Sequence, residues 1–311
     1  MKLKDFLYYF LFAVGIVLIL YLIISSKILE NLDIFREVNY ALLTLAFILT
    51  NLNVIVKIYR WQYISQLYEC EIPFTESTKI VVGSFFVSGA TPAKVGEIVK
   101  AYLMKKRHNL SLINGVSGIL YERVFEIAIL FLVSMGIFSL GLQEKNLIIL
   151  QLTLALLVIF LIAYFFADQV AGLARNLINK TKIATIDSAN LQFRKLAPKH
   201  ALIIFLISAA AWILEFLRLW VVVKAFGFDL SLFQVSVFFS LAVLIGFLSQ
   251  IPIGIGVFEG SLAFFLKEAG IPSYYAFGIA LVDRVISMYY VMIIGLIYYK
   301  WALRSIMDES P

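Results

Sequence analysis

Residues 85–123 read FFVSGATPAKVGEIVKAYLMKKRHNLSLINGVSGILYER, and residues 246–284 read GFLSQIPIGIGVFEGSLAFFLKEAGIPSYYAFGIALVDR. The two stretches share a proline, a glycine four residues later and a terminal acid–arginine pair: Pro92, Gly96, Glu122 and Arg123 in the first, and Pro252, Gly256, Asp283 and Arg284 in the second. Each stretch interrupts an otherwise apolar chain. Paired interrupted segments in two halves of a membrane protein are typical of a transporter's binding site.

The amino-acid composition indicates that most of the protein surface faces lipid. Of its 311 residues, 62% are hydrophobic and 15% are charged, and the mean hydropathy is +0.95. A soluble domain needs a polar exterior, so the sequence predicts a polytopic membrane protein in contact with membrane lipids. The net charge of +6 is attributed to basic cytoplasmic loops and not to nucleic-acid binding. The apolar run 6–24 is long enough for an uncleaved first span.

The fold class predicted is all-α: a polytopic transmembrane helical bundle that forms a single integral membrane domain over 1–311. Candidate spans are apolar runs of sufficient length: 6–24, 40–56, 124–142, 147–167, 201–223, 232–251 and 274–299. The linker 168–200 has apolar residues at helical spacing, so both an amphipathic helix on the cytoplasmic surface and an ordinary solvated helix fit it.

Basic residues orient the chain. With cytoplasmic N- and C-termini, most of the 26 lysines and arginines fall in cytoplasmic segments, which include 57–79 and 168–200. Two broken-helix hairpins must then enter from opposite faces, one around 73–104 and one around 232–270. The sequence therefore predicts an inverted repeat, with repeat 1 at about 40–142 and repeat 2 at about 201–299. A full crossing by 232–251 would change this count.

Ionisable side chains within these spans and hairpins are the candidate functional residues. Each costs roughly 2.5–3.5 kcal/mol at the lipid-facing centre of a helix, so they must face one another, water or a ligand. They are Lys94, Glu97, Lys100, Glu122, Arg123, Glu126, Glu215, Arg218, Glu259, Asp283 and Arg284. The alternative to a binding site is a set of salt bridges. Glu215 and Arg218, three residues apart on one helix face, are predicted to be such a structural pair.

The first hairpin break is basic. Lys94, Glu97 and Lys100 follow Pro92 at three-residue spacing, where a new helix would point its free N–H groups into the membrane. Together these groups predict an anion site of phosphate size. A hydrated cytoplasmic helix at the membrane interface fits the same residues.

The second hairpin break is rich in glycine. Pro252, Gly254 and Gly256 indicate unwound backbone or close helix approach. Glu259 is the acid of this break, and it is expected to take a proton or a cation, or to pair with an arginine.

Arg123 and Arg284 are the predicted phosphate ligands, because a guanidinium fork matches phosphate oxygens. Lys94 and Lys100 are expected to assist them. Gating or proton coupling is assigned to the acids Glu97, Glu122, Glu126, Glu259 and Asp283. No catalytic residue, cofactor or metal site is predicted, since no nucleophile–histidine pair is evident and Cys70 is the lone cysteine.

Three motifs resemble a known family. TPAKVGEIVKAYL at 91–103, YERVFE at 121–126 and PIGIGVFEG at 252–260 are similar to the transmembrane region of lysylphosphatidylglycerol synthases, which also occurs alone in flippase-like prokaryotic membrane proteins. The resemblance covers roughly 5–300. It implies lipid handling. Lys94 and Lys100 stand where the family more usually has arginine. Since no part of these 311 residues resembles the soluble aminoacyl-transfer domain, lysyl transfer by this chain is not expected.

The leading hypothesis is a transporter of the flippase type that moves an anionic lipid or lipid-linked headgroup between leaflets. One alternative is a membrane transferase acting on a lipid-linked donor, with Glu97 or Glu259 as general base. The other is a non-transporting partner of a lipid-modifying enzyme. A homo-oligomer or a complex with a lipid-synthesising enzyme is compatible with each hypothesis.

Overall fold

The computed structural model describes residues 3–91, 96–140 and 196–307. All regular structure in these ranges is helical, which confirms the predicted all-α class. The predicted span 147–167 and nearly all of the linker 168–200 lie outside the described residues. Pro92 and Lys94 lie outside them as well.

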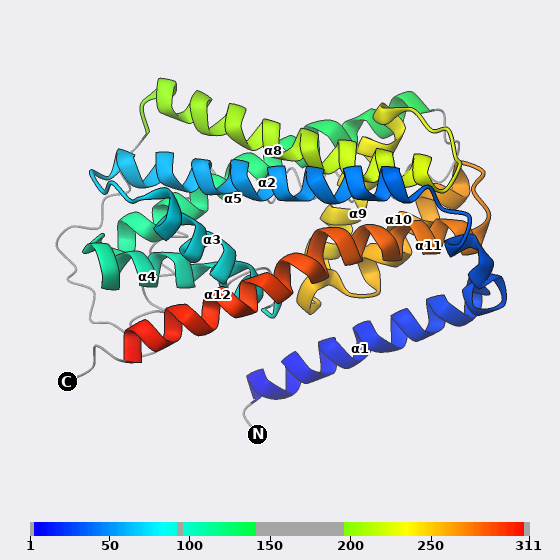
Figure 1. Ribbon diagram of the computed structural model, residues 1–311, viewed down its shortest axis with the longest axis horizontal. Coiled ribbons are helices and arrows are strands. Elements are labelled where there is room, and N and C mark those ends of the chain that lie inside the picture. Colours follow the sequence, from blue (N-terminus) through cyan, green and yellow to red (C-terminus); the bar gives the residue numbers. More distant parts are fainter. Residues whose placement is uncertain (1–2, 92–95, 141–195, 308–311) are drawn as a thin grey trace.

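Two long helices form the centre of the bundle. α2 (Tyr40–Leu67) and α8 (Pro198–Ala225) each have 28 residues, and they lie side by side with opposite directions (Figure 1). The side chain of Asn39 caps the start of α2, where its Oδ1 accepts hydrogen bonds from the backbone N–H groups of Ala41 and Leu42 at 3.1 and 3.2 Å. Pro198 opens α8, a position that needs no N–H donor.

Several helices are long and apolar enough to cross a membrane. Within the described residues these are α2, α8 and the helix 273–300, and the bent pair of α1 (Leu3–Ser25) and η1 (Ile28–Phe35) would make a fourth span. Large apolar side chains on the outer faces of these helices are more than half exposed, among them Leu206, Ile213 and Ile293. Such a surface suits lipid, so the chain is a multi-pass membrane protein.

α2 is longer than its apolar run. The prediction ended this span at 56 and assigned 57–79 to a cytoplasmic linker, which was wrong for Lys57 and Arg60. Both lie within α2, which continues to Leu67, and Arg60 is buried. The apolar run ends early because these charged side chains are paired inside the bundle and do not face lipid.

Two helical hairpins occupy opposite ends of the long axis. α3 (Phe74–Gly89) and α4 (Ile98–His108) form one, and α9 (Leu232–Leu248) and α10 (Val257–Glu268) form the other, with both breaks toward the middle (Figure 1). α10 packs against α9, so 232–251 is one arm of a hairpin. The re-entrant topology and the inverted repeat stay predictions.

Each hairpin is followed by a further helix. α5 (Leu112–Ser134) and the 3₁₀ turn η3 (Met135–Leu140) follow the first, and α5 includes charged residues that precede the apolar run 124–142. After the second come α11 (Ser273–Arg284), a π-helical turn η6 (Val285–Tyr289) and α12 (Tyr290–Met307). The π turn was not expected within 274–299. Such turns are frequent at functional sites.

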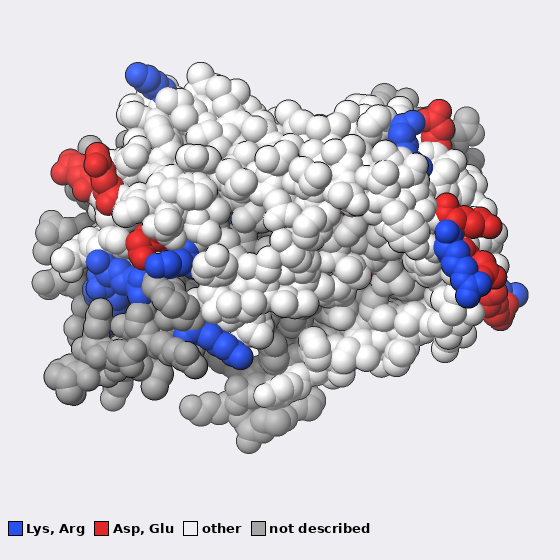
Figure 2. Space-filling model, viewed as in Figure 1, with Lys and Arg blue, Asp and Glu red and all other residues white. Residues whose placement is uncertain are grey.

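The apolar core is divided into two clusters, one around each hairpin. Trp61, Ile80 and Met104 belong to the cluster of the first hairpin, and Phe238 and Leu262 belong to that of the second. On the face shown in Figure 2, charged side chains gather toward the two ends of the molecule, and the broad band between them is almost entirely uncharged.

Cysteine labelling tests the hairpin topology. In a Cys70→Ser background, cysteines replace exposed residues at the ends of the first hairpin (Glu71, Lys105) and of the second (Asp229, Lys267). A membrane-impermeant maleimide should label both sites of one hairpin from the same side and the other hairpin from the opposite side. Labelling of the two ends of either hairpin from opposite sides would show that this hairpin crosses the membrane.

Candidate functional site

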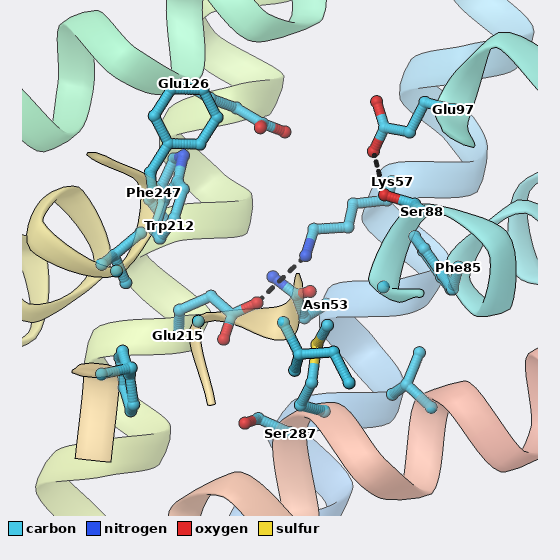
Figure 3. A pocket seen from close by; sticks show the side chains of 18 of the residues that line it. Asn53, Lys57, Phe85, Ser88, Glu97, Glu126, Trp212, Glu215, Phe247 and Ser287 are labelled. Carbon is cyan, nitrogen blue, oxygen red and sulfur yellow. Dashed lines mark hydrogen bonds and ion pairs between the residues drawn. The ribbon is translucent and has the colours of Figure 1, made fainter. Parts of the chain in front are cut away.

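A cavity of about 210 Å³ lies between the two hairpin breaks. Its wall includes Thr91 and Glu97 from the first break and Ile253 and Gly254 from the second. α2, α3, α5, α8, α9, the π turn and α12 also contribute to the wall, and Figure 3 shows side chains that converge on this space from several helices. The cavity therefore brings together segments that are far apart in the sequence.

Arg123 of α5 is held by two carboxylates. Its Nε lies 2.9 Å from Oε2 of Glu97, and its Nη2 donates to the other oxygen of the same carboxylate. Its Nη1 lies 2.5 Å from Oε2 of Glu126, one helical turn away. Ser88 at the end of α3 donates a further hydrogen bond to Glu97 at 3.3 Å. This arrangement fixes the guanidinium against the first hairpin break.

Arg284 has the corresponding place beside the second break. Its Nε lies 3.1 Å from Oε1 of Glu259, and its Nη2 donates to the carbonyl oxygen of Ile253 at 2.8 Å. The guanidinium carbon lies 3.8 Å from the centre of the Phe258 ring. Arg284 therefore contacts a carboxylate, a backbone carbonyl group of the unwound segment and the face of an aromatic ring.

Local hydrogen bonds hold both breaks. The hydroxyl of Thr91 accepts the backbone N–H of Gly96 at 2.7 Å in the first break. In the second, Oε2 of Glu259 accepts the N–H of Gly256 at 2.8 Å. Gly254 and Gly256 have φ of +66° and +79°, a backbone conformation that glycine adopts without a steric cost. The predicted unwound backbone at these glycines is thus observed.

A second layer of ion pairs ties the long helices to the rest of the bundle. Arg218 of α8 binds Asp283 of α11 at 2.9 and 3.3 Å and also contacts Glu215. The pairing of Glu215 with Arg218 was predicted, and Asp283 and Lys57 extend it. Lys57 of α2 reaches Glu215 at 3.0 Å across the cavity (Figure 3).

Arg60 is the main buried residue that the sequence prediction missed. Its Nε and Nη2 lie 3.1 and 2.6 Å from Glu122 and Glu126, and its Nη1 lies 3.0 Å from the hydroxyl of Ser208 on α8. Lys100 pairs with the other oxygen of Glu122, and its Nζ lies 4.4 Å from the centre of a tryptophan ring.

The ion pairs recur in the two halves. Arg60 and Arg218 occupy the same position along α2 and α8, helices of equal length. Arg60 binds Glu122 of the helix after the first hairpin, as Arg218 binds Asp283 after the second. In the same way, the pair of Arg123 with Glu97 corresponds to the pair of Arg284 with Glu259. Alignment of α2 with α8 would have revealed Arg60.

The predicted site residues therefore occupy one region of the bundle wherever the structure describes them. Those that line the cavity are Glu97, Lys100, Glu122, Arg123, Glu126, Glu215, Arg218, Gly254 and Arg284. Glu259 and Asp283 are buried behind Arg284 and Arg218. Within the described residues, no group of histidine, cysteine and acidic side chains has a geometry that could hold a metal ion.

Substitution of a buried pair tests its structural role. Arg218→Gln leaves Asp283 charged and buried, and loss of one partner of such a pair costs roughly 3–5 kcal/mol. The variant should therefore unfold at a markedly lower temperature in detergent. Arg218→Gln combined with Asp283→Asn should recover part of this loss, because no bare charge remains.

The matched control is Lys224→Gln, also on α8, which removes an exposed pair with Asp229 and should change the unfolding temperature little. Additive losses in the Arg218→Gln/Asp283→Asn variant would contradict the direct pairing.

Comparison with known proteins agrees with this architecture. Residues 9–295 match the family described as the lysylphosphatidylglycerol synthase TM region. A UPF0104 membrane protein of Methanothermobacter thermautotrophicus is 28% identical over 97% of this chain and 95% of its own length. Another, from Methanocaldococcus jannaschii, is 26% identical over 72% of this chain and 97% of its own length. The chain belongs to the lysylphosphatidylglycerol synthase TM region family.

Proposed function

We propose that this protein is a flippase-type transporter that moves an anionic lipid, or a lipid-linked phosphate headgroup, between the leaflets of the membrane. The observation that carries the proposal is the position of Arg123 and Arg284 on the wall of one cavity between two broken hairpins. A charged headgroup needs such a polar site inside the bundle, whereas its acyl chains can stay in lipid beside the apolar outer surface.

The two arginines are the proposed phosphate ligands. Each lines the cavity and is already bound to a glutamate, Arg123 through two nitrogens to Glu97 and Arg284 through Nε to Glu259. A phosphate can accept hydrogen bonds from a guanidinium in place of a carboxylate. The carboxylates would then act as gates, since they compete with the headgroup for the arginines. Glu122, Glu126 and Asp283 complete the proposed gating set.

Lys100 has a different role from the one first expected. Its side chain is 5% exposed and bound to Glu122, so in this proposal it supports the phosphate site by holding that carboxylate. Lys94, which lies outside the described residues, remains a proposed phosphate ligand.

Alternating access is the proposed mode of movement. The hairpins lie at opposite ends of the bundle (Figure 1). Residues of both breaks line the same cavity. If they enter from opposite faces, rearrangement of one hairpin at a time opens the cavity to one leaflet at a time. With cytoplasmic termini, the first hairpin faces the cytoplasm.

A transferase is less well supported. Its proposed general base, Glu97 or Glu259, would need a carboxylate oxygen free to accept a proton from the substrate. Both oxygens of Glu97 contact Arg123, and those of Glu259 bind Arg284 and the N–H of Gly256.

Reconstituted vesicles test the proposed function. With a fluorescent phosphatidylglycerol, wild type should speed its passage between leaflets, and Arg123→Ala and Arg284→Ala should each reduce this rate about tenfold or more, through loss of a charge-assisted contact. Dithionite quenching measures the rate. Lys224→Gln is the control, and thermal unfolding shows whether each variant is folded. Wild-type rates in both folded arginine variants would refute the roles given to them, and lipid turnover in detergent would instead indicate a transferase.

A further inference from the structure

The two halves touch at the crossing of α2 and α8. The amide of Asn53 donates to the carbonyl oxygen of Ala211 at 2.6 Å, and Lys57 meets Glu215 at 3.0 Å. Both contacts join residues 158 positions apart, which is also the separation of the first residues of α2 and α8. Lys57 and Glu215 therefore occupy corresponding positions of the two halves and carry opposite charges. One turn further along the same helices, the corresponding residues Arg60 and Arg218 carry the same charge.

Lys57 and Glu215 are also accessible from the cavity. Their side chains are 26% and 14% exposed, whereas those of Arg60 and Arg218 are 3% and 1% exposed. Figure 3 shows Lys57 and Glu215 pointing toward each other across the cavity, with Asn53 beside them. A ligand in the cavity can reach Lys57 without moving a helix.

Separation of Lys57 from Glu215 does not leave the Glu215 carboxylate without a cation. Glu215 keeps its contact with Arg218 when Lys57 leaves. In contrast, Glu259 would keep no cation if Arg284 left it, only the N–H of Gly256 and the hydroxyl of Tyr289. Lys57 can therefore be transferred to a ligand without leaving an unpaired buried charge. The same holds for Lys100, because Glu122 keeps Arg60, but the Lys100 side chain is only 5% exposed.

We propose that Lys57 is a direct ligand of the headgroup phosphate and that Glu215 is its internal competitor. This inference rests on the proposed function and adds a residue to the same site. When a phosphate enters, Lys57 turns from Glu215 to the phosphate, and Glu215 stays with Arg218. A lysine ammonium suits this exchange, because it is a compact charge on a flexible stem and needs no fixed fork geometry.

Phosphate binding would also break one contact between α2 and α8, the ion pair of Lys57 with Glu215. Lys57 and Glu215 connect α2 to α8 only while no phosphate holds Lys57. Occupancy of the cavity is thereby coupled to the freedom of the two halves to move past each other.

Opposite shifts in affinity are the test. Purified protein in detergent is titrated with dihexanoyl phosphatidic acid, dihexanoyl phosphatidylcholine or inorganic phosphate. The change in intrinsic tryptophan fluorescence reports binding, because Trp212, one of the four tryptophans, lies on the cavity wall. Glu215→Gln removes the competitor and should tighten phosphatidic acid binding about tenfold, whereas Lys57→Gln should weaken it about tenfold. Phosphatidylcholine, whose headgroup has no net charge, should respond less.

Three variants guard against misfolding. Lys57→Arg keeps the charge and should keep most of the affinity. Lys57→Gln combined with Glu215→Gln leaves no bare charge and should bind as weakly as Lys57→Gln alone. Asp229→Asn, in an exposed pair at the end of α8, should leave binding unchanged.

The proposal would be overturned if Lys57→Gln and Glu215→Gln weakened phosphatidic acid binding equally, or if neither changed it. The ion pair would then have only a structural role. Inorganic phosphate that binds through Lys57 as tightly as phosphatidic acid would exclude the lipid headgroup as the preferred ligand. Failure of the transport function is separate: wild type would then move no lipid in vesicles while the Lys57-dependent binding persists. Failure of this inference alone would leave transport intact and insensitive to Lys57→Gln.

Discussion

The pairing of charges inside an apolar bundle is the constraint on which this structure depends. A charged side chain that faces lipid is costly, so each buried arginine needs a carboxylate at hydrogen-bonding distance. Arg60 and Arg218 connect the long helices to the helices that follow the hairpins. Arg123 and Arg284 hold the hairpin breaks themselves. The same contacts thus determine helix packing and the polarity of the cavity.

The two halves use the same pattern of ion pairs. An arginine on a long helix binds the acid of a later acid–arginine sequence, and the arginine of that sequence binds a glutamate at the start of the second hairpin arm. The two halves meet in the cavity, where Lys57 and Glu215 break the correspondence. Lys100 and Glu126 of the first half also have no charged counterpart in the second, so the cavity wall is only partly symmetric in charge.

Much of the fold could be predicted because the apolar runs are long and the breaks carry proline and glycine. The all-α class, the helices around 6–24 and 201–223, and the interruptions near 249–256 follow from these signals. The end of α2 could not be predicted in this way. Lys57 and Arg60 terminate the apolar run, yet the helix continues, because their partners come from helices much later in the chain. The π turn after Arg284 has no sequence signal that hydropathy detects.

By itself, the sequence determined that the chain belongs in a membrane, that two segments are broken, and that acid–arginine sequences follow both. These are properties of composition and local spacing. Only the tertiary structure decided which acid each arginine binds and that both breaks border one cavity. The physical reason is that an ion pair is set by distance in space. Arg60 and Ser208 are 148 residues apart in the chain, and the crossing of α2 and α8 brings them to 3.0 Å.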